Sequence, residues 1–171
     1  MADTLAVDIK ASLVWLFQDT LDLSIVADVS KLEYTVALPD GTATDEADRL
    51  WHDQRTVAAS ANDDLDLTAL ARTIFGSAVS IEMVKVKALL IVNIATTAGE
   101  ELLVGGAAAQ AWAAPFGAST HKVRVPADSC LLLINRKSGW AVANGSSDVL
   151  RIANAGTGDI TYRIAVVGTS A

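Results

Sequence analysis

The sequence predicts an all-β protein: an antiparallel β-sandwich, jelly-roll-like, with a less regular β arm at its N-terminus. Two observations lead to this prediction. From position 79 onward, short apolar segments alternate with turn signals at nearly even spacing, which is typical of a compact antiparallel sandwich or barrel. In addition, 51% of the 171 residues are hydrophobic but only 5% are aromatic. Small and β-branched side chains therefore make up most of the core, and such side chains suit closely packed sheets.

The N-terminal part begins with a clear alternation over 5–17, which predicts one long strand or two strands with a kink. The apolar residues of one parity are Leu5, Val7, Ile9, Ala11, Leu13, Trp15 and Phe17. Weaker extended patterns follow over 21–29, 32–38 and, after a Pro-Asp-Gly turn and a polar stretch at 42–49, over 50–59. Beyond the acidic turn at 62–64, Asp66 or Thr68 is expected to cap a short helix through Ile74 that Gly76 ends.

The second half gives a more regular series of strands. They are predicted over 81–94, 101–104, 121–125, 130–134, 140–143, 149–153 and 160–167. Asn144-Gly145 is a strong hairpin signal between two of them. The run 130–134 is apolar throughout and is interpreted as a strand buried on both faces. Cys130, the single cysteine, lies in this run and is therefore expected to be buried and unreactive.

The strand pattern is less regular in the N-terminal part than in the C-terminal part, which suggests that the two parts have different roles. We expect residues 1–70 to form an N-terminal β segment that serves as an attachment arm, and residues 71–171 to form a β-sandwich domain that folds on its own. The strand over 5–17 is suited to completing the sheet edge of a neighbouring molecule by β-augmentation. The alternative, that this strand fills the chain's own sheet, is left open by the sequence.

Charge and hydropathy narrow the classes of partner. The formal net charge is −7, and the chain lacks a basic footprint, so binding to nucleic acid is not expected. The same charge argues against an anionic membrane surface, and the apolar runs are too short and interrupted to span a bilayer. The start of the chain does not have the pattern of a secretory signal. A protein partner remains fully compatible with this composition.

Residues with catalytic or metal-binding chemistry are scarce. His52 and His121 are the only histidines, and their spacing matches no zinc motif or catalytic triad. The acidic cluster at 62–66 lacks the glycine and distal glutamate of an EF-hand and is interpreted as a solvated turn. Glycines at 105 and 106 are not part of a phosphate-binding loop. We therefore expect no catalysis, no metal and no cofactor.

The tryptophans are the more informative side chains. Trp15, Trp51, Trp112 and Trp140 each lie near a predicted strand or a segment of small residues. Such residues are either core side chains or anchors in a subunit contact, because Trp is enriched at interface hot spots. The candidate contact residues for a second subunit or another partner are Trp15, Phe17, Trp51 and Trp112.

A pattern of strand and turn residues over about 40–171 resembles a family of small structural proteins of tailed bacteriophages and prophages. The segments that carry the resemblance are DGTATDEAD (40–48), LWHDQRTVAA (50–59), DLDL (64–67), VKVKA (84–88), LVGG (103–106), PFG (115–117), VPA (125–127), GWAV (139–142) and LRIAN (150–154). The resemblance implies a component of the virion, made in the host cytoplasm.

The function expected on this basis is head decoration, cement or spike. The chain would form a homo-oligomer, most simply a trimer, and would adhere to a phage capsid or tail protein, with multivalency making modest contacts firm. One alternative is a tail or receptor-binding module that recognises a host surface glycan. A third class, a small sugar-modifying enzyme, would need a cluster of histidines and carboxylates that this chain barely supplies.

Overall fold

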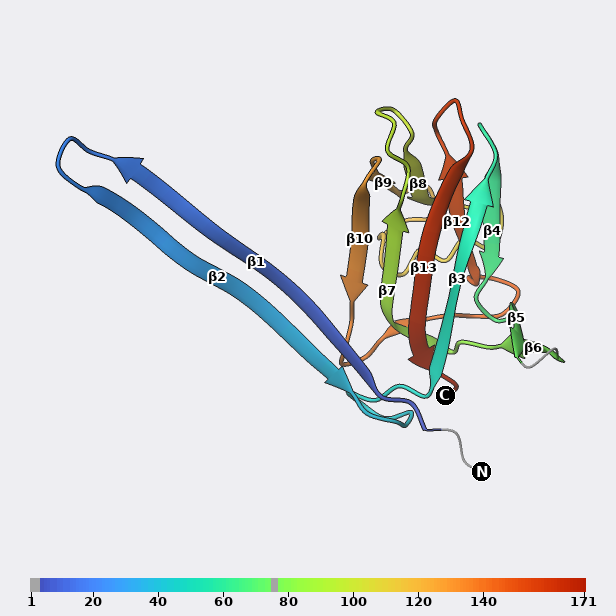
Figure 1. Cartoon of the computed structure of the whole chain (residues 1–171). Helices are drawn as coiled ribbons and strands as arrows, with labels where there is room; N and C mark the ends of the chain where they lie inside the picture. Colours follow the sequence, from blue (N-terminus) through green and yellow to red (C-terminus); the bar gives the residue numbers. More distant parts are fainter. Residues whose placement is uncertain (1–3, 75–76) are drawn as a thin grey trace.

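The computed structural model describes residues 4–74 and 77–171. Every regular element within these two ranges is a β-strand, and the strands pair in the antiparallel sense. The molecule consists of a compact body and a long β-hairpin that projects from one end of the body (Figure 1). The all-β prediction is therefore confirmed.

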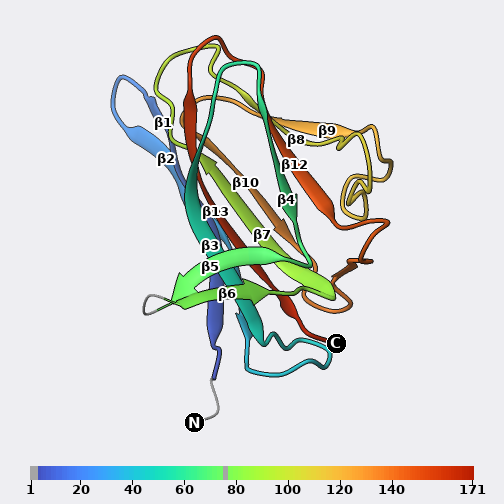
Figure 2. The same cartoon turned by 90° about the vertical axis from the view of Figure 1, so that its right-hand side faces the viewer.

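A five-stranded sheet and a four-stranded sheet form the body, and the fifth strand of the first, β11, is described below. One has the order β10-β7-β13-β3 and the other has the order β4-β12-β8-β9. Their strands are β3 (Arg49–Val57), β4 (Asn62–Asp66), β7 (Lys85–Asn93), β8 (Leu102–Gly105), β9 (Lys122–Val125), β10 (Ser129–Ile134), β12 (Val149–Asn154) and β13 (Ile160–Thr169). The sheets lie face to face (Figure 2), as predicted for an antiparallel sandwich.

Three short strands complete the body. β11 (Trp140–Ala141) pairs with the start of β7 and extends the edge that β10 occupies. β5 (Leu70–Ile74) and β6 (Ser77–Ile81) form a separate hairpin near the end of the body where the C-terminus lies (Figure 1). Trp51 of β3 reaches this hairpin, because its indole N–H donates a hydrogen bond to the carbonyl of Ala71 at 3.0 Å.

The core lies between the two sheets, because alternate residues of each strand point inward. The inward side chains include Trp51, Leu89, Ile91 and Val166 from one sheet and Leu65, Val104 and Ile152 from the other. Trp112, from the alanine-rich segment between β8 and β9, closes one side of the core, where its ring meets those of Phe116 and Trp140 edge to face. Its indole N–H donates to the carbonyl of Ala141 at 3.0 Å, so this polar group is satisfied inside the core.

An ion pair links the two sheets where β3 turns into β4. Arg55 of β3 donates two hydrogen bonds to Asp63 of β4, at 2.5 and 2.8 Å. The hydroxyl of Tyr162 on β13 donates to the same carboxylate at 2.8 Å. Burial, followed by the bond to Asp63, raises the pKa of the Tyr162 phenol. The bond to Asp63 also raises the pKa of Arg55, so the guanidinium of Arg55 stays charged at neutral pH.

The projecting hairpin, called the arm below, consists of β1 (Val7–Thr20) and β2 (Ile25–Leu38). The two strands pair without a break from Val7 opposite Leu38 to Thr20 opposite Ile25. The two weaker strands predicted at 21–29 and 32–38 are thus one continuous strand. A turn at 21–24 joins β1 to β2, and the N–H of Leu21 donates to the carbonyl of Ser24 at 2.8 Å.

The arm is attached to the body by a second, smaller apolar cluster. Its arm residues, called the arm root, are Val7, Ile9, Val36 and Leu38. They pack on the outer side of the β10-β7-β13-β3 sheet, against Leu50, Ala88 and Val167. Val36 and Leu38 are buried there, so the first few residue pairs of the arm are held firmly by the body.

The predicted domain boundary at residue 70 is wrong. β3 pairs with β13 along nine residue positions, and β4 pairs with β12. Both strands precede residue 70, yet each belongs to one of the two sandwich sheets. The boundary therefore falls after Leu38, and the sandwich begins with β3.

The short helix predicted through Ile74 is also wrong. The side chain of Asp66 accepts hydrogen bonds from the N–H and the hydroxyl of Thr68, at 2.8 and 2.7 Å. This local bonding makes a tight turn, as Asp side chains often do, and the chain continues into β5 instead of a helix. Gly76, expected to end the helix, lies outside the described residues.

The revised boundary predicts the outcome of two deletions. A chain that begins at Leu70 lacks β3 and β4 and should fail to give a cooperative thermal transition. In contrast, the arm-shortened variant, which lacks Leu13–Thr20 and Ile25–Leu32, should unfold cooperatively near the temperature of the full chain. This variant keeps the arm root and the native turn at 21–24. Ser12 and Glu33, which already pair in the full arm, then flank the turn directly, and every remaining residue keeps its side of the arm. Cooperative unfolding of the chain from Leu70 would restore the earlier boundary.

The ion pair between the sheets predicts the effect of removing one hydroxyl. Tyr162→Phe takes a hydrogen bond away from the largely buried carboxylate of Asp63 and should lower the free energy of unfolding by about 1–2 kcal/mol, measured by urea denaturation. Tyr34→Phe is the matched control, because Tyr34 is exposed on the arm, and it should leave the midpoint unchanged. Equal effects of the two substitutions would contradict the proposed role of Tyr162.

Candidate functional site

One side of the arm carries a continuous apolar stripe beyond the arm root. Odd-numbered residues of β1 and their partners on β2 lie on this side. We call its exposed part the arm face, formed by Leu13, Trp15, Phe17, Leu32 and Tyr34. Phe17 is 74% exposed, Leu32 68% and Leu13 64%. These residue types are typical of a core, yet here they are exposed to solvent. The indole N–H of Trp15 donates a hydrogen bond to Asp28, on the same side of the arm, at 3.2 Å.

The other side of the arm changes character along its length. Near the body it is polar, with Lys10 opposite Thr35 and Ser12 opposite Glu33. Farther out it carries more apolar side chains, and Leu16 lies opposite Val29. The distal half of the arm therefore exposes large apolar side chains on both sides, with a few polar and charged residues among them.

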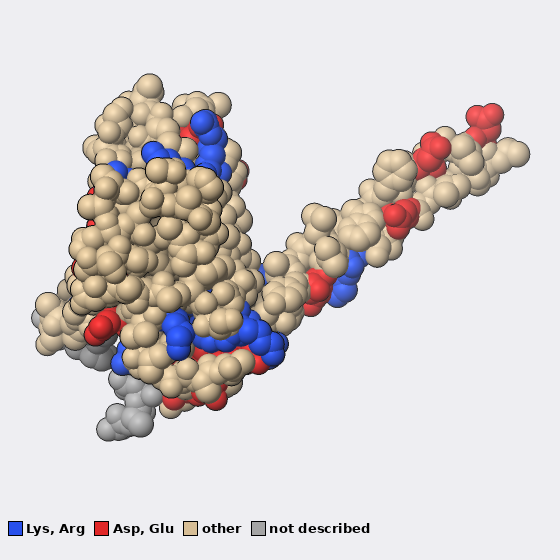
Figure 3. Space-filling view, turned by 180° about the vertical axis from the view of Figure 1, so that it is seen from behind, with Lys and Arg blue, Asp and Glu red and all other residues tan. Residues whose placement is uncertain are grey.

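Exposed apolar side chains are concentrated on the arm to an unusual degree. Twelve of the fourteen large hydrophobic residues that are exposed within the described ranges belong to it. Figure 3 shows the arm from behind: its surface is mostly uncharged, with a few charged groups spaced along it. A monomeric protein rarely exposes contiguous apolar patches of this kind, and those that exist mark interaction sites. A two-stranded hairpin alone is also at best marginally stable in water.

The body presents a second apolar surface beside the arm. It is the outer side of β7 and β10, called the sheet face below, and it consists of Leu90, Val92, Cys130, Leu132 and Ile134. Leu132 lies opposite Leu90 and Cys130 opposite Val92. Leu90 is 38% exposed, and the remaining residues are partly or fully exposed. A groove of about 370 Å³ begins here and runs to the arm root, between Leu90 and Leu132 on one side and Val7 and Ile9 on the other.

Cys130 is exposed, so the prediction that it is buried is wrong. β10 is an edge strand of its sheet, and Cys130 points to the outer side, which nothing in the described chain covers. The apolar run at 130–134 has the composition of a strand buried on both faces, but only one face meets the core.

The four predicted contact residues divide into two pairs. Trp15 and Phe17 lie on the arm face, where a partner can reach them. Trp51 and Trp112 are core residues, 2% and 1% exposed, so their side chains are not available to a partner. Analysis of the sequence did not identify the sheet face or the aliphatic residues of the distal arm. The uninterrupted apolar run at 13–17 is the signal that identifies the distal arm, because it places apolar side chains on both sides of one strand.

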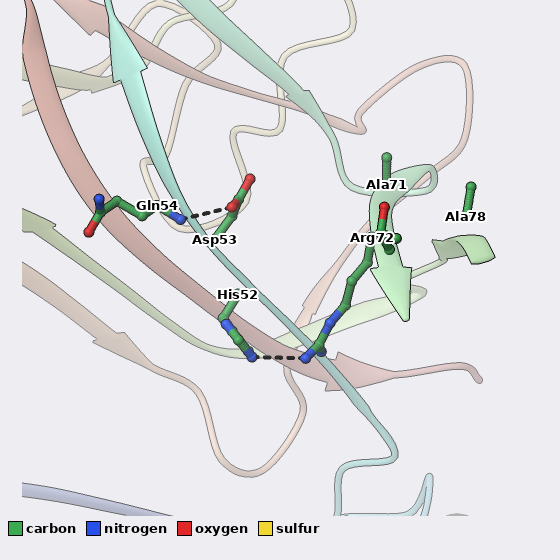
Figure 4. A pocket seen from close by; sticks show the side chains of 7 residues that line it. His52, Asp53, Gln54, Ala71, Arg72 and Ala78 are labelled. Atoms are coloured by element: carbon green, nitrogen blue, oxygen red, sulfur yellow. Dashed lines mark hydrogen bonds between the residues drawn. The ribbon is translucent and has the colours of Figure 1, made fainter. Parts of the chain in front are cut away.

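A polar notch on β3 is the alternative site. His52, Asp53 and Gln54 line it together with Arg72, Ala71, Thr73 and Ala78 from the β5–β6 hairpin (Figure 4). His52 is hydrogen-bonded to Arg72 through its Nε2 atom at 3.0 Å, and Asp53 accepts a bond from the backbone N–H of Gln54 at 2.9 Å. The notch contains no cysteine or serine nucleophile among its lining residues.

The two histidines do not come together. His121 lies between β8 and β9, where its Nδ1 atom is hydrogen-bonded to the carbonyl of Phe116 at 2.9 Å. Within residues 4–74 and 77–171, no three side chains of His, Cys, Asp or Glu form a group that could hold a metal ion. The same ranges contain no helix that is long and apolar enough to cross a membrane.

Comparison with models of known protein families gives no match, and the search of curated proteins gives none either. The candidate site therefore rests on the geometry of the arm and of the sheet face.

The exposure of Cys130 predicts fast reaction with a thiol reagent. In the arm-shortened variant, which keeps only Tyr34 of the arm face, the folded protein should react with Ellman's reagent at nearly the rate of the urea-unfolded chain, because the reagent reaches an exposed thiol without any opening of the fold. Slowing by orders of magnitude in the folded variant would show that the body itself covers Cys130.

Proposed function

We propose that this chain is a structural protein of a tailed-phage particle, which attaches to the particle and to copies of itself through its arm. The observation that supports this most strongly is the exposed apolar arm, rooted in the body by Val36 and Leu38 and unpartnered beyond them. An arm of this kind is suited to adhesion, because burial of its apolar side chains on a partner supplies the driving force for association.

The order of the strands supports a jelly-roll body. Among the eight sandwich strands, the first in the chain pairs with the last, β3 with β13, and the second with the seventh, β4 with β12. The third pairs with the sixth, β7 with β10, and the fourth with the fifth, β8 with β9. This nested pairing supports the jelly-roll proposal, because the jelly rolls of viral capsid and lectin domains are built like one long hairpin rolled into two sheets.

The proposed role in head decoration or cementing relies on multivalency. Each copy that binds the particle through its arm and a neighbouring copy through another surface is held by two contacts, and the second contact forms at a high effective concentration. The net charge of −7 is compatible with a protein surface as the partner. We expect the chain to assemble as a homotrimer. Sedimentation analysis of the purified protein measures the number of copies.

This function predicts that the arm-shortened variant stays folded but does not attach. Particles assembled without the protein should bind the full chain in a co-sedimentation assay, and they should not bind the variant, because it has lost most of its apolar arm surface. The control is Thr35→Ala, which alters the polar side of the arm near the root. Attachment of the arm-shortened variant with the affinity of the full chain would contradict the proposal.

A further inference from the structure

The chain exposes two apolar surfaces, the arm face and the sheet face, and none of the residues that the structure describes covers either one. We propose that the arm face of one copy docks on the sheet face of a second copy. This inference rests on the proposed function and deepens it, because it names the surface that receives the arm and the chemistry of that contact.

The arm root provides the precedent for this contact. Val7, Ile9 and their partners on β2 lie on the same side of the arm as the arm face. They already pack on the outer side of the same sheet, against Ala88 and Val167. Ala88 lies opposite Ile134, two residues along β7 from Leu90, so the sheet face directly continues the surface that holds the root. The two surfaces therefore have matching chemistry: aliphatic and aromatic side chains on flat, pleated strands.

A copy's own sheet is too short to receive its whole arm. The fourteen residues of β1 span about 45 Å, whereas the nine residues of β7 span about 30 Å at the usual rise for each strand residue. The arm root already occupies one end of that sheet, and the arm diverges from the body as it extends (Figure 1). Phe17 and the rest of the distal arm thus reach beyond the body that carries them, to where a second copy would lie.

The exposed area suits a stable contact between copies. The rings of Trp15, Phe17 and Tyr34 alone expose roughly 300 Å², judged from the full size of aromatic side chains and their exposed fractions. On the same side of the arm, the exposed side chains of Leu13, Leu32 and Val26 add to this area. A stable interface needs about 800 Å² from each partner, and these six apolar side chains supply a large part of it.

Charge gives the docked arm a direction. Asp28 lies on the same side of the arm as Phe17, directly opposite it, and Asp19 lies two residues farther out. On the outer side of the sheet, Arg163 of β13 lies opposite Val92, and its side chain bonds only to Gln54 among the described residues. An arm that places Leu13 and Leu32 on Leu90 and Leu132 brings its acidic end toward Arg163.

Disulfide trapping tests this contact, with the native Cys130 as the receiving thiol. A tagged chain carries Cys130→Ser and either Leu13→Cys or Phe17→Cys, and it is mixed with the untagged natural chain. Any disulfide between a tagged and an untagged chain must then join the arm to Cys130. We expect this heterodimer on mild oxidation from at least one of the two arm positions. The matched control, Gln18→Cys in the same tagged chain, points to the opposite side of the arm and should give a several-fold lower yield.

A second measurement does not depend on disulfide geometry. Leu132→Glu places a charge in the sheet face and should weaken self-association in sedimentation at micromolar concentration. Thr120→Glu adds the same charge in the exposed loop between β8 and β9 of the other sheet, and it should leave self-association unchanged. In the natural full chain, Cys130 should also react more slowly with Ellman's reagent than in the arm-shortened variant.

The remaining outcomes overturn the inference in distinguishable ways. Disulfides that form only between two arms, or self-association unchanged by Leu132→Glu, would place the contact elsewhere while the proposed function stands. Tight binding of the arm to phosphatidylcholine vesicles, with the chain otherwise monomeric, would make the partner a membrane. Attachment and self-association that persist in the arm-shortened variant would refute both the inference and the proposed function.

Discussion

A two-stranded ribbon has no interior, and the rest of this molecule is organised around that constraint. The backbone groups of the two arm strands can hydrogen-bond to one another, but the apolar side chains on either side of the ribbon can be buried only against another surface. The body supplies that surface for the first few pairs only, through Leu50, Ala88 and Val167. The arm beyond is stable enough to pair without a break, yet its apolar side chains remain in water. Burial of these side chains on a partner therefore supplies free energy for binding.

The polar segment between the arm and the sandwich holds the two together. Asp40 accepts a hydrogen bond from the N–H of Leu5 at 3.1 Å, which ties both strands of the arm at their base. Asp45 forms ion pairs with Arg136 and Lys137 beyond β10. Asp48 binds the N–H of Ser170, near the C-terminus, at 2.8 Å. The acidic stretch that interrupts the strand pattern thus fixes the direction in which the arm leaves the body.

The sequence carries most of the fold, because strands with one buried face alternate visibly. The alternation at 5–17 and the regular spacing from position 79 predict the arm strand and most of the sandwich. The errors arise where partners are distant in the chain. β3 and β4 belong to the sandwich because β13 and β12 pair with them, about a hundred residues later, and no local pattern reveals that pairing. Asp66 looks like a helix cap because caps and tight turns use the same short acidic side chain.

The candidate site is harder to predict, because composition does not say which apolar residues remain uncovered. Trp15 lies in an apolar run and Trp51 is followed by polar residues, yet Trp51 is the one in the core and Trp15 is on the arm. The interpretation of 130–134 as a strand buried on both faces is instructive for the same reason. It is wrong for the isolated chain, in which Cys130 is exposed, but under the proposed docking the outer side of β10 is covered by the arm of a second copy.

Such docking is asymmetric, because one copy contributes its arm face and the other copy contributes its sheet face. A contact of this heterologous kind either closes into a ring or continues without end. Closure depends on the angle between the arm and the sheet that receives it, and the arm root together with the contacts of Asp40, Asp45 and Asp48 sets that angle within each copy. A rigidly held arm therefore favours one ring size, whereas a loosely held arm would permit several. Under the proposed docking, the residues that fix the arm to its own body therefore also set how many copies assemble.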